Sequence, residues 1–210
     1  MRIECIKNGN MDNNAYLLTD EETGECAVVD PGFADDALLN KVKQLTGKLK
    51  YILLTHRHFD HILGAKAIKE LTGAKICIHP KDACGLSNAA FSLADAIGVK
   101  QEALSPDYTF TSDSKVKLGN ATVIVLETPG HTIGSVSFLC GDNLLTGDTL
   151  FRLGAGRTDL PTGNYERLLD SLKKLANLPG DYRVYPGHGK ASTLDVERTL
   201  NPFVIEALKA

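Results

Sequence analysis

The sequence predicts an α+β fold in which two β-sheets pack against each other beneath outer helices. The chain has 210 residues, of which 43% are hydrophobic and 23% are charged, the make-up of an ordinary folded protein. Strand-like runs and helical repeats follow each other in two successive β-then-α halves, without the regular alternation of a doubly wound parallel sheet. No stretch typical of a linker interrupts them, so we expect one domain over residues 1–210.

The N-terminal half begins with short strands and continues with helices between buried strands. Runs rich in β-branched and aromatic residues predict strands at Ile3–Lys7, Asn14–Thr19, Cys26–Asp30, Tyr51–Leu54 and Lys75–Ile78. Apolar residues at helical spacing, each followed by glycine, predict helices over Asp35–Leu45 and Asp60–Leu71. The stretch His79–Asp113 is less regular, with weak helical pieces at Asp82–Leu86 and Ala89–Ile97. The sequence leaves open whether it is a lid or a connection.

The C-terminal half starts with closely spaced strands and ends with helices. The strands are expected at Val116–Leu118, Ala121–Glu127, Ser135–Leu139, Asn143–Thr146 and Tyr182–Tyr185. Leucines at helical spacing predict an amphipathic helix over Tyr165–Ala176. A last helix over Val196–Leu208 should kink or split at Pro202, because proline has no N–H to donate.

Charge and cysteine content limit the expected partners and location. With 23 basic and 26 acidic residues the net charge is −3, which provides no basic field for nucleic acid or an anionic membrane. No apolar run approaches the ~20 residues of a spanning helix, and no signal-peptide pattern is present. The five cysteines are odd in number and form no Cys-x-x-Cys pair. We therefore expect a cytoplasmic protein with mostly buried thiols and with neither a nucleic-acid nor a membrane partner.

Residues with metal-binding chemistry gather directly after the strand Tyr51–Leu54, in the stretch Thr-His-Arg-His-Phe-Asp-His of residues 55–61. Side chains at positions i and i+2 of an extended chain point to the same face, so His56 and His58 can converge on one ion. Asp60 and His61 stand where the chain turns into a helix, and they can reach a second ion at the ~3.5–4 Å separation of two-metal sites. Imidazole and carboxylate ligands suit Zn, Fe or Mn.

Three further candidate ligands follow predicted strands in glycine-containing loops. His131 lies in Thr-Pro-Gly-His-Thr, Asp148 in Thr-Gly-Asp-Thr and His188 in Tyr-Pro-Gly-His-Gly. Glycine at such a place allows the backbone to approach a ligand closely. Five of the six histidines thus stand at strand ends, a pattern that indicates metal binding. The sixth, His79, lacks this setting, and we interpret it as structural or exposed.

Seven candidate ligands suit two divalent ions, with Zn as the expected metal and Fe or Mn as alternatives. The predicted assignment places His56, His58 and His131 on one ion. It places Asp60, His61 and His188 on the other ion, and Asp148 between the two. Asp60 and Asp148 are therefore the predicted catalytic carboxylates. Two cations lower the pKa of a shared water. A structural site, by contrast, would close each ion with four ligands.

These residues resemble the metallo-β-lactamase superfamily, and the resemblance covers nearly the whole chain. It rests on Asp30 in a Val-Asp-Pro-Gly turn, on the motif at residues 55–61, and on His131, Asp148 and His188 in family order. The resemblance implies a four-layer αββα sandwich with the metals at one edge of the two sheets. It also implies that Asp30 steadies the ligands from outside the metal shell. The alternative is that Asp30 is a simple turn aspartate.

Within the superfamily the chain is similar to the short, single-domain hydrolases of the glyoxalase II type. Asp148 stands where β-lactamases of the common type use cysteine, and the stretches Gly154–Asp159 and Glu197–Pro202 resemble that subgroup. We expect no counterpart of the helical domain that follows in full-length glyoxalase II, and the glutathione-binding lysine and tyrosine of that enzyme align with Arg157 and Asp159. Arg157 is predicted to grip a substrate carboxylate, with an Arg157–Asp159 ion pair as the alternative.

The resemblance implies a dinuclear hydrolase that cleaves a small-molecule acyl thioester with a metal-bridging hydroxide as nucleophile. A thiolate leaving group, with a pKa near ~8.5, needs little help from a general acid. A mononuclear Fe(II) persulfide dioxygenase is the alternative, because that group shares the Gly-x-Gly-Arg-Thr-Asp loop and binds iron through residues matching His56, His131 and Asp148. A lactonase or another ester hydrolase of the same fold is a weaker one. The thiol carrier, the acyl group and the oligomeric state stay open.

Overall fold

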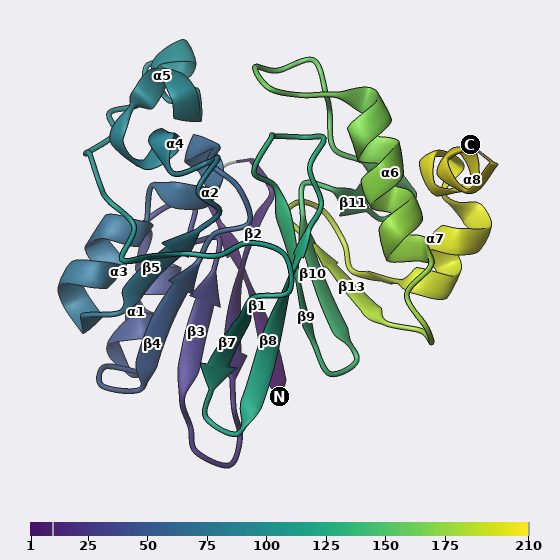
Figure 1. Cartoon of the computed structure of the whole chain (residues 1–210). Coiled ribbons are helices and arrows are strands. Elements are labelled where there is room, and N and C mark those ends of the chain that lie inside the picture. Colours follow the sequence, from purple (N-terminus) through teal and green to yellow (C-terminus); the bar gives the residue numbers. More distant parts are fainter. Residues whose placement is uncertain (10, 210) are drawn as a thin grey trace.

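Two β-sheets face each other in the middle of the molecule, with helices on both outer sides (Figure 1). The computed structural model describes residues 1–9 and 11–209, and within these ranges the strands form two six-stranded sheets and one small hairpin. The first sheet has the order β1 (Arg2–Asn8), β2 (Asn13–Thr19), β3 (Cys26–Val29), β4 (Leu49–Leu53), β5 (Lys75–Ile78) and β6 (Tyr108–Thr109). The second has the order β14 (Ser192–Thr193), β13 (Arg183–Pro186), β10 (Asn143–Gly147), β9 (Val136–Cys140), β8 (Ala121–Glu127) and β7 (Lys115–Leu118). The hairpin pairs β11 (Leu150–Phe151) with β12 (Gly154–Ala155).

The helices divide between the two outer faces and complete four layers. One side carries α1 (Asp36–Lys43) and α3 (Ala65–Thr72), and the other carries α6 (Tyr165–Ala176), α7 (Leu194–Leu200) and α8 (Pro202–Lys209) (Figure 1). Three clusters of buried side chains fill the spaces between layers, represented by Leu38 with Ile52, Leu53 with Phe138, and Leu144 with Leu172. Ile52 and Leu53 belong to different clusters because successive strand residues face opposite sides of a sheet. This order of layers confirms the predicted αββα sandwich.

The predicted helix Asp60–Leu71 is wrong as a single element. The chain forms a short α2 (Phe59–Ile62) and then α3, with a break at Gly64. The N–H of Gly64 donates to the Pro31 carbonyl at 2.8 Å, and a Cβ at Gly64 would lie 2.7 Å from that oxygen. The turn that follows β3 therefore packs into the break, which brings Asp30 and α2 together.

The last helix is divided as predicted. Helix α7 ends at Leu200 and α8 begins at Pro202, because proline fits the first turn of a helix and not its interior. Helix α7 also begins two residues earlier than the expected Val196. Thr193 accepts a hydrogen bond from the Val196 N–H and so caps the earlier start.

Parallel pairing brings the polar strand ends to one edge of the sandwich. Strands β3, β4 and β5 run parallel to one another in the first sheet, and β10 and β13 run parallel in the second. The residues that follow these strands therefore leave the sheets at the same end. Asp30 follows β3, residues 55–61 follow β4, Asp148 follows β10 and His188 follows β13.

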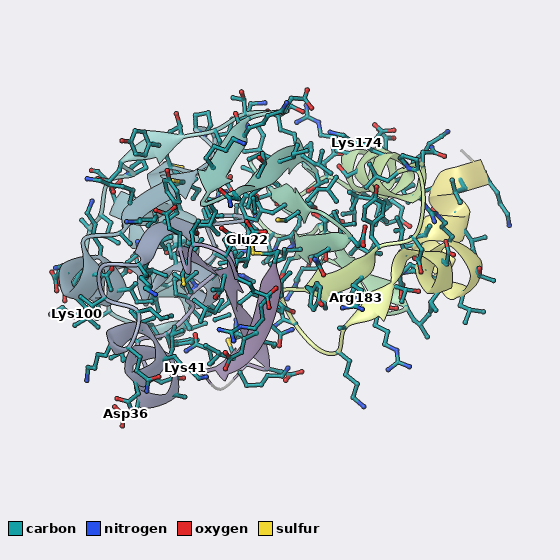
Figure 2. All side chains as sticks on the ribbon, turned by 90° about the horizontal axis from the view of Figure 1, so that it is seen from below. Glu22, Asp36, Lys41, Lys100, Lys174 and Arg183 are labelled. Atoms are coloured by element: carbon teal, nitrogen blue, oxygen red, sulfur yellow. The ribbon has the colours of Figure 1, made fainter. Side chains whose placement is uncertain are left out.

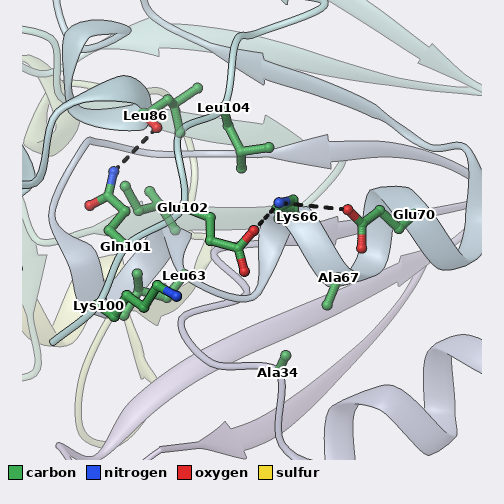
Figure 3. Close-up of a pocket in the computed structure, with 11 residues that line it drawn as sticks. Ala34, Leu63, Lys66, Ala67, Glu70, Leu86, Lys100, Gln101, Glu102 and Leu104 are labelled. Atoms are coloured by element: carbon green, nitrogen blue, oxygen red, sulfur yellow. Dashed lines mark hydrogen bonds and ion pairs between the residues drawn. The ribbon is translucent and has the colours of Figure 1, made fainter.

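Whereas residues 108–109 lie in the first sheet as β6, residues 84–97 rise above this edge, opposite the loop that precedes α6 (Figure 1). They contain α4 (Cys84–Ser87), α5 (Ala89–Ser92) and the 3₁₀ turn η1 (Asp95–Ile97). The chain that follows η1 is fastened to α3 around a cavity of about 240 Å³, where Lys66 pairs with Glu70 and Glu102 and the Gln101 side chain donates to the Leu86 carbonyl (Figure 3). This cavity is lined by α3 and residues 100–104 rather than by the predicted ligands.

The opposite end of the sandwich carries charged side chains on its periphery. Viewed from there, Asp36 and Lys41 of α1 lie on one side and Lys174 of α6 lies on the other (Figure 2). Within the described ranges, no helix has the length and apolar character that crossing a membrane requires. The predicted single domain, residues 1–210, includes Asn10 and Ala210, which lie outside the described residues, and it stays a prediction.

Candidate metal centre

The structure brings all seven predicted ligands together at the edge where the strands end. Among the described residues, three groups have ligand atoms that lie within 4.8 Å of one another: His56, His58 and His131; Asp60, His61 and His188; and Asp30, His56 and His61. In the first, His58 Nδ1 lies 2.9 Å from His131 Nε2. In the second, His61 Nε2 lies 3.2 Å from His188 Nε2. These are the two groups that the sequence assigns to two ions.

Asp148 lies between the two groups and contacts both. Its Oδ2 is 3.6 Å from His131 Nε2 and 3.5 Å from His188 Nε2. Its Oδ1 is 3.4 Å from His61 Nε2. Oδ2 thus lies near histidines of both groups, a position that is compatible with the predicted bridging role.

Backbone carbonyls orient two of the histidines from behind. His131 Nδ1 donates to the Arg157 carbonyl at 2.7 Å, and His188 Nδ1 donates to the Met11 carbonyl at 3.0 Å. Because a carbonyl oxygen only accepts, Nδ1 carries the proton in both rings. The Nε2 atom of each histidine therefore faces the centre, as in metal-ligating histidines generally, and it can bind an ion when it carries no proton.

Asp30 performs the same task for two more histidines. Its Oδ1 accepts from the Thr55 N–H at 2.8 Å, and its Oδ2 accepts from the Thr55 hydroxyl at 2.6 Å and from His61 Nδ1 at 3.0 Å. The Thr55 hydroxyl has only one proton, which Asp30 receives, so it accepts from His56 Nδ1 at 3.0 Å. Both His56 and His61 consequently direct their Nε2 atoms to the centre. These contacts favour the steadying role over a simple turn aspartate.

The carboxylates of the centre govern the protonation of its histidines. Burial and the neighbouring His131 lower the pKa of His58 to about 3, so this ring is neutral. Burial also disfavours the charged forms of His61 and His188, but the carboxylates of Asp148 and Asp60 outweigh it and raise their pKa to about 9 and about 11. These two rings thus lie beside buried carboxylates whose negative charge attracts cations, whether protons or divalent ions.

Unpartnered buried atoms support the same conclusion. Across residues 1–9 and 11–209, His56 Nε2 and Asp148 Oδ1 have no hydrogen-bond partner, although both are buried. Buried polar atoms rarely stay unpaired in native proteins. Imidazole nitrogens and carboxylate oxygens that converge in this way fit Zn, Fe or Mn.

Arg157 does not extend toward the centre as a free cation. Its Nε and NH2 groups donate to the two carboxylate oxygens of Asp159 at 2.7 and 2.6 Å, and both side chains are about two-thirds exposed, at 63% and 66%. The structure thus forms the ion pair that the sequence left as the alternative. For Arg157 to bind a substrate carboxylate, this ion pair would have to break. The substrate-binding role of Arg157 stays a prediction.

Two polar residues near the centre were not identified from the sequence. Asn13 donates through Nδ2 to the Asp60 carboxylate at 3.0 Å and to the Asp60 carbonyl at 2.8 Å. The signal was a pair of asparagines at the start of an otherwise apolar strand. The other is Thr55, which directly precedes the histidine motif. His79, interpreted as structural or exposed, is buried and contacts Glu127 Oε1 at 3.0 Å.

Known proteins are similar to this chain in both sequence and fold. A family model of the metallo-β-lactamase superfamily matches residues 8–188. Hydroxyacylglutathione hydrolase GloC of Haemophilus influenzae is 34% identical over 209 residues, which cover 97% of this chain and 98% of that protein. The crystal structure of BLEG-1, a B3 metallo-β-lactamase, has a TM-score of 0.89 at 34% identity and covers 97% of this chain and 99% of that one. TTHA1623, solved in a di-iron-bound form, has a TM-score of 0.83 at 35% identity and covers 95% of this chain and 99% of that one.

The αββα sandwich, the ligand-bearing loops at one edge and these matches agree with one another. They confirm the resemblance inferred from the sequence motifs. The chain therefore belongs to the metallo-β-lactamase superfamily, and this membership supports a metal-dependent hydrolase as its broad class.

Proposed function

We propose that this chain is a dinuclear metal-dependent hydrolase that cleaves small-molecule acyl thioesters, as enzymes of the glyoxalase II type do. The observation that carries the proposal is the position of Asp148, within 3.6 Å of histidines from both ligand groups. The similarity to GloC, which is named a hydroxyacylglutathione hydrolase, supports an acyl thioester as substrate.

His56, His58 and His131 would hold one ion, Asp60, His61 and His188 the other, and Asp148 would bridge both. When bound, two divalent ions supply a water of lowered pKa and positive charge for the oxyanion that forms at the acyl carbon. The chain fixes the orientation of the histidine rings in advance, because each ring whose Nδ1 is hydrogen-bonded to an outer partner can direct only Nε2 toward the centre.

The two carboxylates have different surroundings. Asp60 receives the Asn13 amide on its Oδ2, which orients that oxygen toward His188 at 3.3 Å. Asp148 Oδ1 has no hydrogen-bond partner in the described part of the chain, so it is the oxygen with unused capacity. A thiolate leaving group departs without a strong general acid. The chain's own residues thus orient the metal ligands, and none of them needs to donate a proton to the leaving thiolate.

Zn is the proposed metal, and the di-iron form of TTHA1623 supports Fe as the alternative. A cytoplasmic location and the lack of nucleic-acid or membrane partners belong to the same proposal. They rest on the net charge of −3 and on the absence of disulfide-type cysteine spacing in the sequence.

The test is a hydrolysis assay with a hydroxyacyl thioester of glutathione, followed by loss of thioester absorbance, beside oxygen uptake with glutathione persulfide. We expect thioester turnover that is lost in His58→Ala and kept in Glu197→Gln, whose carboxylate contacts Leu153, Asn201 and Ser192 and none of the seven candidate ligands. Oxygen uptake with persulfide and no thioester turnover would contradict the proposal and favour the mononuclear iron dioxygenase.

A further inference from the structure

Asp82 is a buried carboxylate that belongs to neither ligand group. Its side chain is fully buried, at 0% exposure, and it accepts three hydrogen bonds. Oδ2 accepts from the Arg57 N–H at 3.1 Å and from the Thr132 hydroxyl at 2.6 Å, and Oδ1 accepts from the Gly134 N–H at 3.0 Å. One side chain therefore satisfies donors from two separate loops.

Both of these loops carry ligands of the three-histidine group, whereas Asp60 and His61 of the second group follow Arg57 within helix α2. Arg57 stands between His56 and His58, and Thr132 directly follows His131. Asp82 thus connects the backbone segments that must keep His58 Nδ1 and His131 Nε2 at 2.9 Å. The second group has other supports, which are Asn13 on Asp60 and the Met11 carbonyl on His188.

Neighbouring contacts show that the connection is built closely. A Cβ at Gly134 would lie 2.6 Å from Asp82 Cγ, so only glycine lets the backbone approach this carboxylate. Three residues before Asp82, His79 Nδ1 accepts from the Lys81 N–H at 3.2 Å, which leaves Nε2–H to donate to Glu127 Oε1 at 3.0 Å. Glu127 ends β8, immediately before the loop of His131. The turn at residues 79–82 is thus tied to that loop at both ends.

We propose that Asp82 is a positioning residue that sets the metal affinity of the three-histidine group and leaves the other group unaffected. The inference rests on the proposed dinuclear function. An amide at this position has one acceptor oxygen and would turn its NH2 toward a donor. Asp82→Asn therefore releases one loop from the other while it keeps the size of the side chain.

The experiment compares zinc dissociation constants, obtained by chelator competition, and cobalt absorption spectra among variants. For Asp82→Asn we expect one ion to bind about tenfold or more weakly and the other to change by less than about twofold, since outer contacts of metal ligands contribute roughly 10–100-fold to affinity. His58→Ala provides the cobalt spectrum of a centre with a damaged three-histidine group, and His188→Ala that of a centre with a damaged second group. The Asp82→Asn spectrum should resemble that of His58→Ala.

Glu197→Gln is the matched control. Glu197 is fully buried and accepts from the Leu153 N–H at 2.8 Å, from Asn201 Nδ2 at 2.7 Å and from the Ser192 hydroxyl, all outside the two loops. We expect this variant to unfold at a lower temperature while both zinc affinities stay at the wild-type values. A change in affinity in this variant equal to that of Asp82→Asn would overturn the inference, because it would follow from lost stability alone.

The outcomes separate the inference from the proposed function. Wild-type protein that fails to bind two ions overturns the proposed function, and the inference with it. Wild-type protein that binds two ions, together with Asp82→Asn that keeps both affinities or loses both equally, overturns the inference alone. If Asp82→Asn does not fold, Thr132→Val removes the shortest of the three hydrogen bonds, and the same selective loss is expected there. Unchanged affinities in Thr132→Val would then overturn the inference.

Discussion

Replacement of Asp30 by asparagine should disturb both ligand groups, because its carboxylate orients one histidine of each. Asparagine has nearly the same size and tolerates the left-handed backbone of this residue, whose φ is 49°. Its single acceptor oxygen can keep the Thr55 N–H, but its NH2 then faces the donors that Oδ2 serves, the Thr55 hydroxyl and His61 Nδ1. The Thr55 hydroxyl would turn away and no longer accept from His56.

The size of the effect follows from the lost contacts. Two hydrogen bonds to a charged acceptor contribute about 1.5–3 kcal/mol each, so the ion-free chain should lose about 3 kcal/mol or more of unfolding free energy. His56 and His61 would no longer be restricted to the tautomer with a free Nε2. Each ion should therefore bind about 10–100-fold more weakly, which corresponds to about 1.4–2.8 kcal/mol per ion.

Urea unfolding of the ion-free protein and chelator competition with zinc measure the two effects separately. Asp107→Asn is a suitable control, because Asp107 accepts from the Ile76 N–H at 2.8 Å and pairs with Lys69 outside the metal centre. It should lose stability without losing metal. Asp30→Asn that binds two ions with wild-type affinity would refute the role assigned to Asp30. The loss of both affinities also distinguishes it from Asp82→Asn, for which one loss is expected.

Three further predictions concern single sites. His58→Ala should lower thioester turnover more than about 100-fold with the fold retained by circular dichroism, and wild-type turnover in this variant would show that the three-histidine group is not catalytic. The pKa values of His61 and His188 are raised to about 9 and about 11, so protons compete with metal ions for these two rings. Metal affinity should therefore fall as the pH is lowered, by about tenfold per pH unit for each proton that the ion displaces. A dissociation constant from chelator competition that does not change with pH would contradict this. Gly64→Ala should lower the unfolding free energy measured in urea by about 1–3 kcal/mol, because the added Cβ would lie 2.7 Å from the Pro31 carbonyl oxygen. Gly154→Ala is the control and should change the unfolding free energy little, because the nearest atom to its Cβ, in Phe151, lies at 3.7 Å. Equal effects of the two substitutions would refute the packing argument.

The strands and the clustering of the candidate ligands could be predicted because their signals are local. Runs such as Ala121–Glu127 and the leucine repeat of Tyr165–Ala176 coincide with β8 and α6 at both ends. His56 and His58 follow a short apolar strand, so their spacing alone indicates a shared face. The grouping of seven ligands into two sets required no knowledge of the strand order.

What could not be predicted depends on contacts between distant segments. Strands β6, β11, β12 and β14 have only two residues each and carry no periodic pattern. The break at Gly64 exists because the Pro31 turn packs there, which the helical spacing of residues 60–71 does not reveal. Asp82 and Asn13 contact residues that lie 25 to 52 positions away, so even the asparagine pair at the start of β2 does not reveal from the local sequence which residue Asn13 contacts.

The most direct test of the account is the metal content of the chain purified without added metal, measured by elemental analysis alongside thioester turnover on the same sample. The geometry of Asp148 between two ligand groups predicts about two ions per chain, Zn or a Zn/Fe mixture, with turnover present. His188→Ala should reduce the count to about one. One iron per chain without thioester turnover would contradict the dinuclear hydrolase.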